Sequence, residues 1–102
     1  MSNGKNLPAL KSDDLEKMAA RFKMLGEPMR LKILQAVCKQ ARPVNDIVAA
    51  TGSTQANVSK HLALLAAGGI LQREKNGQCV FYGVKDKLAI KLCEMVRSQI
   101  TA

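Results

Sequence analysis

The chain has 102 residues, 47% of them hydrophobic, and this favours one folded domain with a modest core over a disordered segment. Its net charge of +8 favours a polyanionic partner, either a nucleic acid or an anionic membrane surface. The membrane alternative is weakened because no apolar run approaches the ~20 residues that span a bilayer. Residues 1–8 lack the apolar core of a signal peptide, so we expect a cytoplasmic protein with reduced cysteines.

The N-terminal part of the chain predicts a tail and then a helix. Residues 1–11 are polar, so we expect a flexible tail followed by a single domain over residues 12–102. Asp13 and Glu16 have the spacing of a capping box, which predicts a helix start. Apolar residues then recur at helical spacing until Gly26, where we expect the first helix to end.

Two further helices are expected next. The second should begin at Pro28, because proline is favoured in a first helical turn, and should end near residues 40–43. The third is short and should lie between Asn45, a good N-cap residue, and Gly52, a natural C-cap.

A fourth helix, capped by Ser53 or Thr54, precedes a change to a strand-like pattern. Segments 70–75 and 78–84 flank Asn76-Gly77, a strong signal for a β-hairpin turn. A two-residue turn there would pair Lys75 with Gln78, Arg73 with Val80 and Leu71 with Tyr82.

The last helix is expected to begin after Asp86 as its N-cap. Only 3% of the chain is aromatic, and a small domain with few large rings often completes its core across a subunit interface. We therefore expect a homodimer in which the last helix buries a second face. Its apolar residues cover more than the single stripe that a surface helix needs: Leu88, Ala89, Leu92, Cys93, Met95, Val96 and Ile100.

This order of elements predicts a winged helix-turn-helix fold, mainly α-helical, with about five helices and a two-stranded hairpin as the wing. In such a fold the third helix packs across the fourth, and the outer face of the fourth is free to enter the major groove of double-stranded DNA.

Polar side chains on that outer face can donate to or accept from base edges, and N–H groups at the helix start can receive a phosphate. Cations near the hairpin tip suit the DNA backbone or the minor groove. The alternative is a winged-helix protein-interaction module without DNA binding, but the charge favours DNA. The candidate DNA-binding residues are Ser53, Thr54, Gln55, Asn57, Ser59, Lys60, His61, Arg73, Lys75 and Gln78.

Three segments resemble the ArsR/SmtB family of repressors. Leu25–Leu34 (LGEPMRLKIL) resembles the family's second helix, Val58–Leu71 (VSKHLALLAAGGIL) its recognition helix, and Arg73–Tyr82 (REKNGQCVFY) its wing. The resemblance spans nearly the whole chain. It implies a homodimer joined through its first and last helices. It also implies repression at an inverted-repeat operator, relieved when an inducer binds.

The family's metal sites are not matched, so we expect no metal and no cofactor. Its thiolate site on the third helix would need cysteines where this chain has Pro43, Asn45 and Val48. Its site on the last helix runs Asp, His, His and then an acid or a further His, at positions where this chain has Asp86, Leu88, Gln99 and Ala102.

The cysteines leave two interpretations open. Some members of the family sense oxidants or reactive sulfur through one thiol in the second helix and one in the last, so Cys38 and Cys93 are candidate redox-sensing residues. The alternative is that they are small buried hydrophobes. A thiol-dependent enzyme is disfavoured, since no nucleophile or paired carboxylate is placed near His61, the single histidine.

Overall fold

The computed structural model describes residues 7–101, and its first helix, α1 (Ser12–Leu25), begins where the sequence changes to helical spacing. The capping box expected at Asp13 is absent, because the N-cap is Lys11 and no side chain caps the helix. The flexible tail expected over residues 1–11 stays a prediction, since residues 1–6 lie outside the described residues. Ala102, at the end of the expected domain, also lies outside them.

Helix α2 (Pro28–Val37) begins with its proline in the first turn, as predicted. The carboxylate of Glu27 caps it by accepting a hydrogen bond from the Met29 backbone N–H at 3.1 Å. A short strand, β1 (Arg42–Pro43), follows and was not predicted.

Helix α3 (Val44–Thr51) and helix α4 (Gln55–Ala67) form the helix-turn-helix. The expected cap at Asn45 is wrong, because the helix already starts at Val44 with Pro43 as N-cap. The expected C-cap is confirmed: Gly52 has φ +69°, a left-handed conformation that costs a side chain-bearing residue free energy. This glycine turns the chain from α3 into α4.

Strands β2 (Leu71–Asn76) and β3 (Cys79–Val84) form the hairpin, but their register differs from the predicted one. Asn76 pairs with Cys79, so the turn consists of Gly77 and Gln78 rather than Asn76 and Gly77. The physical reason is the backbone. A type I′ turn at Asn76-Gly77 needs positive φ at Asn76, whereas Gly77 alone takes it here (φ +66°), as the first residue of a type II′ turn.

All partners therefore shift by two residues: Lys75 pairs with Val80, Arg73 with Tyr82 and Leu71 with Val84. Because side chains alternate along a strand, a shift of two leaves each side chain on its predicted face of the sheet. Strand β1 pairs antiparallel with β3, which gives the sheet order β1-β3-β2. A Cβ at position 83 would lie 3.0 Å from that of Ala41, so Gly83 permits this close approach.

Helix α5 (Lys87–Thr101) ends the described chain. Asp86 caps it as predicted, because its Oδ1 accepts from the Leu88 N–H at 3.0 Å. The other oxygen of Asp86 forms an ion pair with Arg21 of α1, and this contact ties the start of α5 to the first helix.

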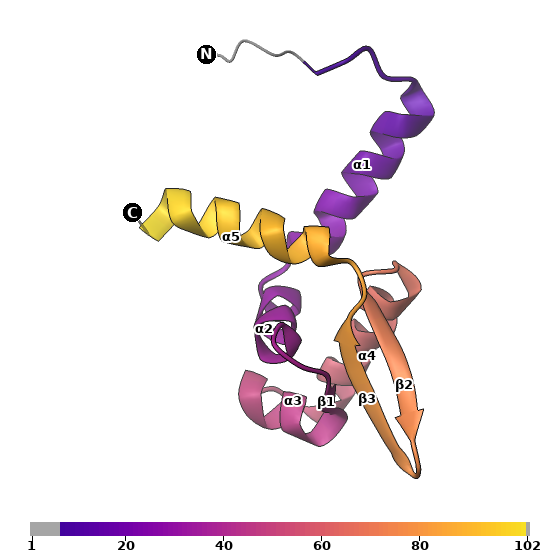
Figure 1. Ribbon diagram of the computed structural model, residues 1–102, viewed down its shortest axis with the longest axis vertical. Helices are drawn as coiled ribbons and strands as arrows, with labels where there is room; N and C mark the ends of the chain where they lie inside the picture. Colours follow the sequence, from indigo (N-terminus) through magenta and orange to yellow (C-terminus); the bar gives the residue numbers. More distant parts are fainter. Residues whose placement is uncertain (1–6, 102) are drawn as a thin grey trace.

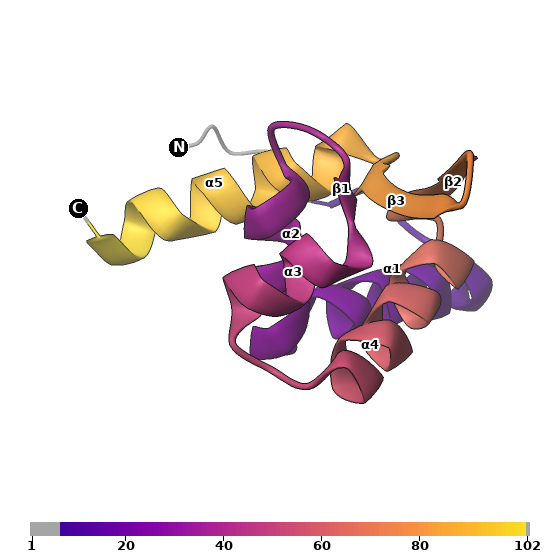
Figure 2. The same cartoon turned by 90° about the horizontal axis from the view of Figure 1, so that it is seen from below.

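The core lies where α2, α3, α4, the sheet and the start of α5 meet, and Figures 1 and 2 show these elements gathered on one side of the molecule while α1 and the end of α5 extend from it. Helix α1 contributes a single buried residue, Leu25, and α5 contributes Ala89. The predicted winged helix-turn-helix is confirmed, with five helices and a hairpin in the part of the chain that the structure describes. The core residues are Leu25, Ile33, Leu34, Val37, Ile47, Val58, Leu62, Leu65, Ile70, Leu71 and Ala89.

The turn between α3 and α4 gives a prediction. Gly52→Ala should lower the free energy of unfolding by about 1–2 kcal/mol, because a residue with a Cβ is strained in the left-handed conformation. The added Cβ would meet no other atom within 4 Å, so the loss would come from backbone strain and not from a steric clash. Gly52→Asn should lose less, since asparagine tolerates this conformation. Urea unfolding of both variants measures the difference, and equal losses would mean that backbone strain is not the cause.

Candidate nucleic-acid interface

Helix α4 is held by its inner face. Val58, Leu62 and Leu65 are fully buried, at helical spacing of three and four residues. This burial fixes the rotation of the helix about its axis, and the opposite face is left to solvent.

The start of α4 is fixed by polar contacts within the turn. The Thr54 hydroxyl accepts a hydrogen bond from the Asn57 N–H at 3.1 Å and is the N-cap, one of the two predicted. The Asn57 side-chain amide donates to the Ser53 hydroxyl at 2.9 Å. Asn57 and Ser53 are half-buried, so both also hold the turn in shape.

The exposed polar residues at the start of α4 are Thr54, Gln55, Ser59 and Lys60. These side chains include a hydroxyl, an amide and an ammonium group, which together can donate to and accept from base edges or phosphates. The structure therefore brings together the predicted polar residues of the fourth helix, with one exception.

The exception is His61, which does not share the exposed face. Its side chain is 11% exposed, and its Nε2 lies 3.3 Å from Oε2 of Glu27, the N-cap residue of α2. Its Nδ1 accepts a hydrogen bond from Nε of Arg30, also on α2, at 3.2 Å. The ring is thus turned toward α2 and away from the exposed face of α4. The expectation that no carboxylate lies near it is wrong.

The spacing of the buried face could have revealed this position. His61 lies three residues after Val58 and four before Leu65, on the inward stripe of α4. Its partners, Glu27 and Arg30, are more than thirty residues away, and no local pattern predicts such a contact.

The hairpin carries the predicted cations. Arg73, Lys75 and Gln78 are exposed. Arg73 and Lys75 lie two and four residues after Leu71 along β2. Because every second side chain of a strand lies on the same face, they share the face of the sheet that Leu71 turns toward the core. Beyond the end of the core, this face presents the two cations on the side where α4 lies. Between residues 53 and 85 the single acid is Glu74, so the α4–hairpin surface is basic.

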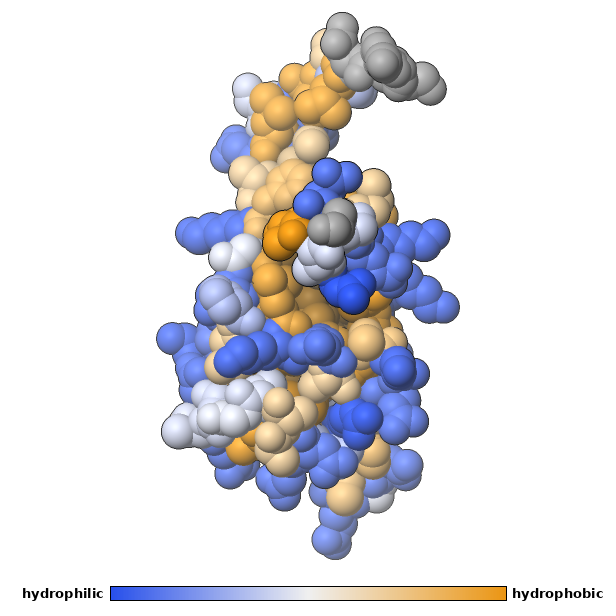
Figure 3. Space-filling view, turned by 90° about the vertical axis from the view of Figure 1, so that its left-hand side faces the viewer, coloured by the Kyte–Doolittle hydropathy of each residue, from blue (hydrophilic) through white to orange (hydrophobic). Residues whose placement is uncertain are grey.

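Apolar side chains are exposed on α1 and α5, away from the helix-turn-helix. Phe22 is 59% exposed and Ile100 is 76% exposed. Figure 3 shows apolar side chains along α1 and around the end of α5. The exposed apolar residues of these helices are Leu15, Met18, Phe22, Leu88, Met95, Val96 and Ile100.

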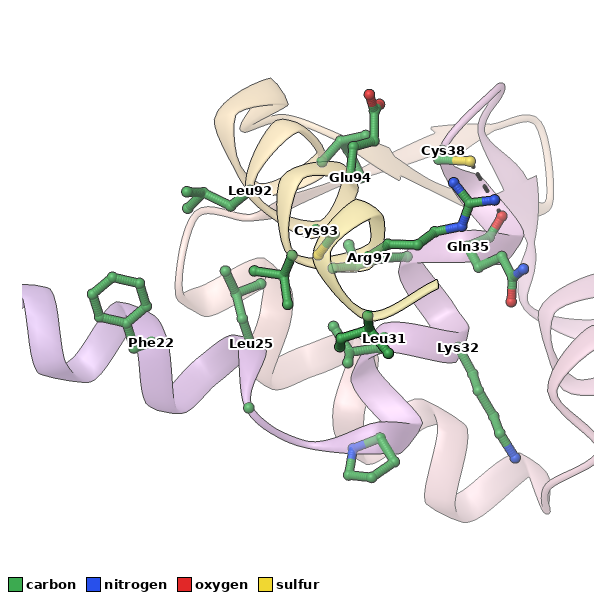
Figure 4. A pocket seen from close by; sticks show the side chains of 16 residues that line it. Phe22, Leu25, Leu31, Lys32, Gln35, Cys38, Leu92, Cys93, Glu94 and Arg97 are labelled. Atoms are coloured by element: carbon green, nitrogen blue, oxygen red, sulfur yellow. Dashed lines mark hydrogen bonds between the residues drawn. The ribbon is translucent and has the colours of Figure 1, made fainter. Parts of the chain in front are cut away.

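A cavity of about 710 Å³ lies among α1, α2 and α5, and both candidate redox-sensing cysteines line it. Cys38 is exposed at the end of α2, where its thiol donates to the Gln35 carbonyl at 3.3 Å. Cys93 is half-buried on α5, and this burial raises the pKa of its thiol. Arg97 extends from α5 toward Gln35 and Cys38 (Figure 4).

Among residues 7–101 no group of three or more His, Cys, Asp and Glu side chains is arranged to hold a metal ion. No helix in this part of the chain combines the length and apolarity needed to cross a membrane.

Comparison with known protein families gives one match. The family model described as "Bacterial regulatory protein, arsR family" matches residues 27–73 of the sequence. The arsenical resistance operon repressor of Bacillus subtilis is 28% identical over 95 residues, covering 87% of this chain and 90% of that protein. An uncharacterized HTH-type transcriptional regulator of Methanocaldococcus jannaschii is 32% identical over 82 residues, which cover 79% of this chain and 92% of that protein.

Solved structures share the fold. The homodimeric winged helix-turn-helix DNA-binding domain of a possible ArsR-family regulator from Mycobacterium bovis matches with a TM-score of 0.80 and 25% identity, covering 95% of this chain and 90% of that one. The antimony-specific transcriptional repressor AntR matches in fold with a TM-score of 0.86 and 24% identity, and the match covers 99% of this chain and 92% of that one.

The different burial of the thiols gives a prediction. At about pH 8, iodoacetamide should alkylate the exposed Cys38 and Cys79 faster than Cys93, because the raised pKa leaves less of the reactive thiolate at Cys93. Mass spectrometry of tryptic peptides measures the three rates. As the pH is raised toward 10, the rate at Cys93 should gain on the other two, and a Cys93 that reacts first at pH 8 would contradict this.

Proposed function

Because the chain belongs to the ArsR family of bacterial regulatory proteins, we propose that it is a homodimeric repressor that binds a specific inverted-repeat operator and is released by an inducer. The family and the fold are those of DNA-binding transcription regulators, not of enzymes. The observation that carries the proposal is the exposed polar face of α4, held beside a basic hairpin by the buried opposite face.

In this proposal the start of α4 enters the major groove. Gln55 and Ser59 contact base edges, and Lys60 contacts bases or phosphates. Thr54, together with Ser53 and Asn57, shapes the turn and presents the N-terminal N–H groups of α4 to a phosphate. The structure motivates one change from the sequence-based proposal, since His61 is assigned no DNA contact.

The hairpin is proposed to track the flanking DNA. Arg73 and Lys75 lie on the same face of β2, and Gln78 lies in the turn at its tip. Arg73 and Lys75 would neutralise phosphates, and Gln78 could donate a hydrogen bond to one. Together they would set the orientation of the protein on the duplex, which does not by itself distinguish sequences.

The dimer is proposed to form through α1 and α5. Seven large apolar side chains are exposed on these two helices, and α1 has one buried residue of its own. The Mycobacterium bovis domain with the same fold is homodimeric. A two-fold dimer would present two copies of α4, which suits an inverted repeat.

The inducer is proposed to be an oxidant or a reactive sulfur species that acts on Cys38 and Cys93. Both thiols line the cavity among α1, α2 and α5, so a bond between them would alter the packing of α2 against α5. With peroxide, the two thiols lose two electrons and two protons to form a disulfide, and the peroxide is reduced to two waters.

The DNA-binding proposal predicts two kinds of mutational effect. Gln55→Ala should cost about 1–3 kcal/mol at particular base pairs of a duplex selected from random sequence. Arg73→Ala should weaken binding to all sequences equally. It should also reduce the salt dependence by about 0.9 log unit per log unit of salt for each lost phosphate contact, or about 1.8 for a dimer that loses one contact per subunit. Fluorescence anisotropy over a salt series measures both. Lys17→Ala, an exposed α1 substitution with the same loss of charge, is the control.

A protein that binds no duplex, or binds one independently of salt, would contradict this proposal in favour of a protein-interaction module. An exchange of the two effects, with Arg73→Ala altering specificity, would mean that the hairpin rather than α4 lies against the bases.

The dimer proposal predicts that Val96→Glu yields a monomer at micromolar concentration, because a carboxylate would be desolvated in an apolar interface. Ser98→Glu introduces the same charge on the polar face of α5, where Ser98 bonds the Met95 carbonyl, and should remain dimeric. Analytical ultracentrifugation decides between the two states. A wild-type protein that sediments as a monomer would refute the dimer.

The thiol proposal predicts that treatment with peroxide or polysulfide lowers DNA affinity in the wild type but not in Cys38→Ser or Cys93→Ser. Cys79→Ser should respond like the wild type, because Cys79 lies on the hairpin and outside the cavity. Anisotropy reports affinity, and mass spectrometry maps the cross-link. If both single variants respond like the wild type, these cysteines are structural and the inducer acts elsewhere.

A further inference from the structure

His61 is the single histidine of the chain, and among the described residues it is one of two buried polar side chains. It lies in the middle of α4, with its ring turned toward α2. Nδ1 accepts from Arg30 Nε at 3.2 Å, and Nε2 lies 3.3 Å from Glu27 Oε2.

These two contacts define the protonation state of the ring. The guanidinium of Arg30 has donors and no acceptor, so Nδ1 has to be an unprotonated acceptor. The remaining ring proton is then on Nε2, which faces the Glu27 carboxylate. The ring is therefore the neutral Nε2–H tautomer in this conformation.

The same side chains also hold the neighbouring helices. Glu27 uses its other oxygen to cap α2. Arg30 donates through Nη1 to the backbone carbonyl of Met24, in the last turn of α1, at 3.2 Å. The methyl group of Met24 lies against the end of α4, where a Cβ on Gly68 would come within 3.1 Å of it. The end of α1 and the start of α2 are thus joined to α4 through Met24, Glu27 and Arg30.

We propose that His61 is a positioning residue for DNA recognition, which holds α4 on the α1–α2 junction while its Nδ1 is unprotonated. This inference rests on the proposed function. Protonation turns Nδ1 from an acceptor into a donor aimed at Arg30, which breaks that hydrogen bond and opposes two positive charges. Glu27 Oε2, buried without a hydrogen-bond partner, attracts the charged ring. The ring then moves from Arg30 toward Glu27, and α4 moves with it.

The other charged groups on the elements packed against α4 are exposed to solvent. Helix α2 has the exposed Lys32. Helix α3 has the exposed Asp46, and strand β2 has the exposed Arg73, Glu74 and Lys75. Lys60, beside His61 on α4, is exposed as well. In the described part of the chain, the charged groups that contact the ring are Glu27 and Arg30.

The proposal sets the sign of a pH effect. An added positive charge near phosphates normally strengthens DNA binding. Release of α4 does the reverse, so acidification should weaken binding by this protein. The chain has a single histidine, so replacing it tests whether the pH effect originates at His61.

The test measures affinity of the full chain for a duplex that the protein itself selects from random sequence at about pH 8. At constant ionic strength, the wild-type affinity should fall between about pH 8 and pH 5.5, by about threefold to tenfold for each His61 that becomes protonated. Circular dichroism at each pH verifies that the protein is folded. An affinity that rises or stays constant in folded protein overturns the proposal.

His61→Asn is the matched variant, because its amide oxygen can accept from Arg30 but does not titrate in this range. Its affinity should be independent of pH and, at pH 8, closer to that of the wild type than is the affinity of His61→Leu. A pH dependence that persists in His61→Asn places the titrating group elsewhere and overturns the proposal.

A second readout needs no DNA. The ¹⁵N chemical shifts of the ring at about pH 8 should identify the Nε2–H tautomer, and the Nδ1–H tautomer would overturn the hydrogen-bond assignment. If no duplex is bound at pH 8, the proposed function fails, and the tautomer still decides the geometry around His61. If a duplex is bound at pH 8 with unchanged affinity at pH 5.5, the positioning inference alone fails.

Discussion

The rest of the structure depends on the burial of one face of α4. Val58, Leu62 and Leu65 insert fully into the core formed with α2, α3 and the sheet. Once these three side chains are buried, the rotation of the helix is fixed, and Gln55, Ser59 and Lys60 have to face solvent. The polar surface proposed to contact DNA is thus a consequence of apolar packing on the other side of the same helix.

A second constraint comes from the size of the core. Among residues 7–101, eleven buried hydrophobic residues form it, and α1 supplies one of them. The free energy that holds α1 in place has to include other contacts, and polar ones join Arg21 to Asp86 and Arg30 to the carbonyl and the sulfur of Met24. A partner subunit that covers α1 and α5 would add an apolar contact that also holds α1 in place. Because Arg30 also contacts His61, the packing of α1 and the seating of α4 are physically connected.

The features predicted from sequence are those with local causes. Apolar spacing, Pro28 and Gly52 identify the helices within a few residues, and the order of elements is sufficient for the winged fold. The hairpin register was missed because the choice between two turn types depends on backbone angles at Asn76 and Gly77. Strand β1 was missed because two residues have no pattern of their own and pair only when β3 is present. The ring of His61 was assigned to the wrong face because its polarity was given more weight than its position between Val58 and Leu65.

The central claim is that the exposed start of α4, with the hairpin, is the surface that meets DNA. Amide and side-chain NMR shifts of the full chain, recorded while a self-selected duplex is added, test it most directly. The account predicts the largest changes at Thr54, Gln55, Ser59 and Lys60 and at Arg73 and Lys75 on the hairpin. Changes confined to α1 and α5, with α4 and the hairpin unaffected, would contradict it.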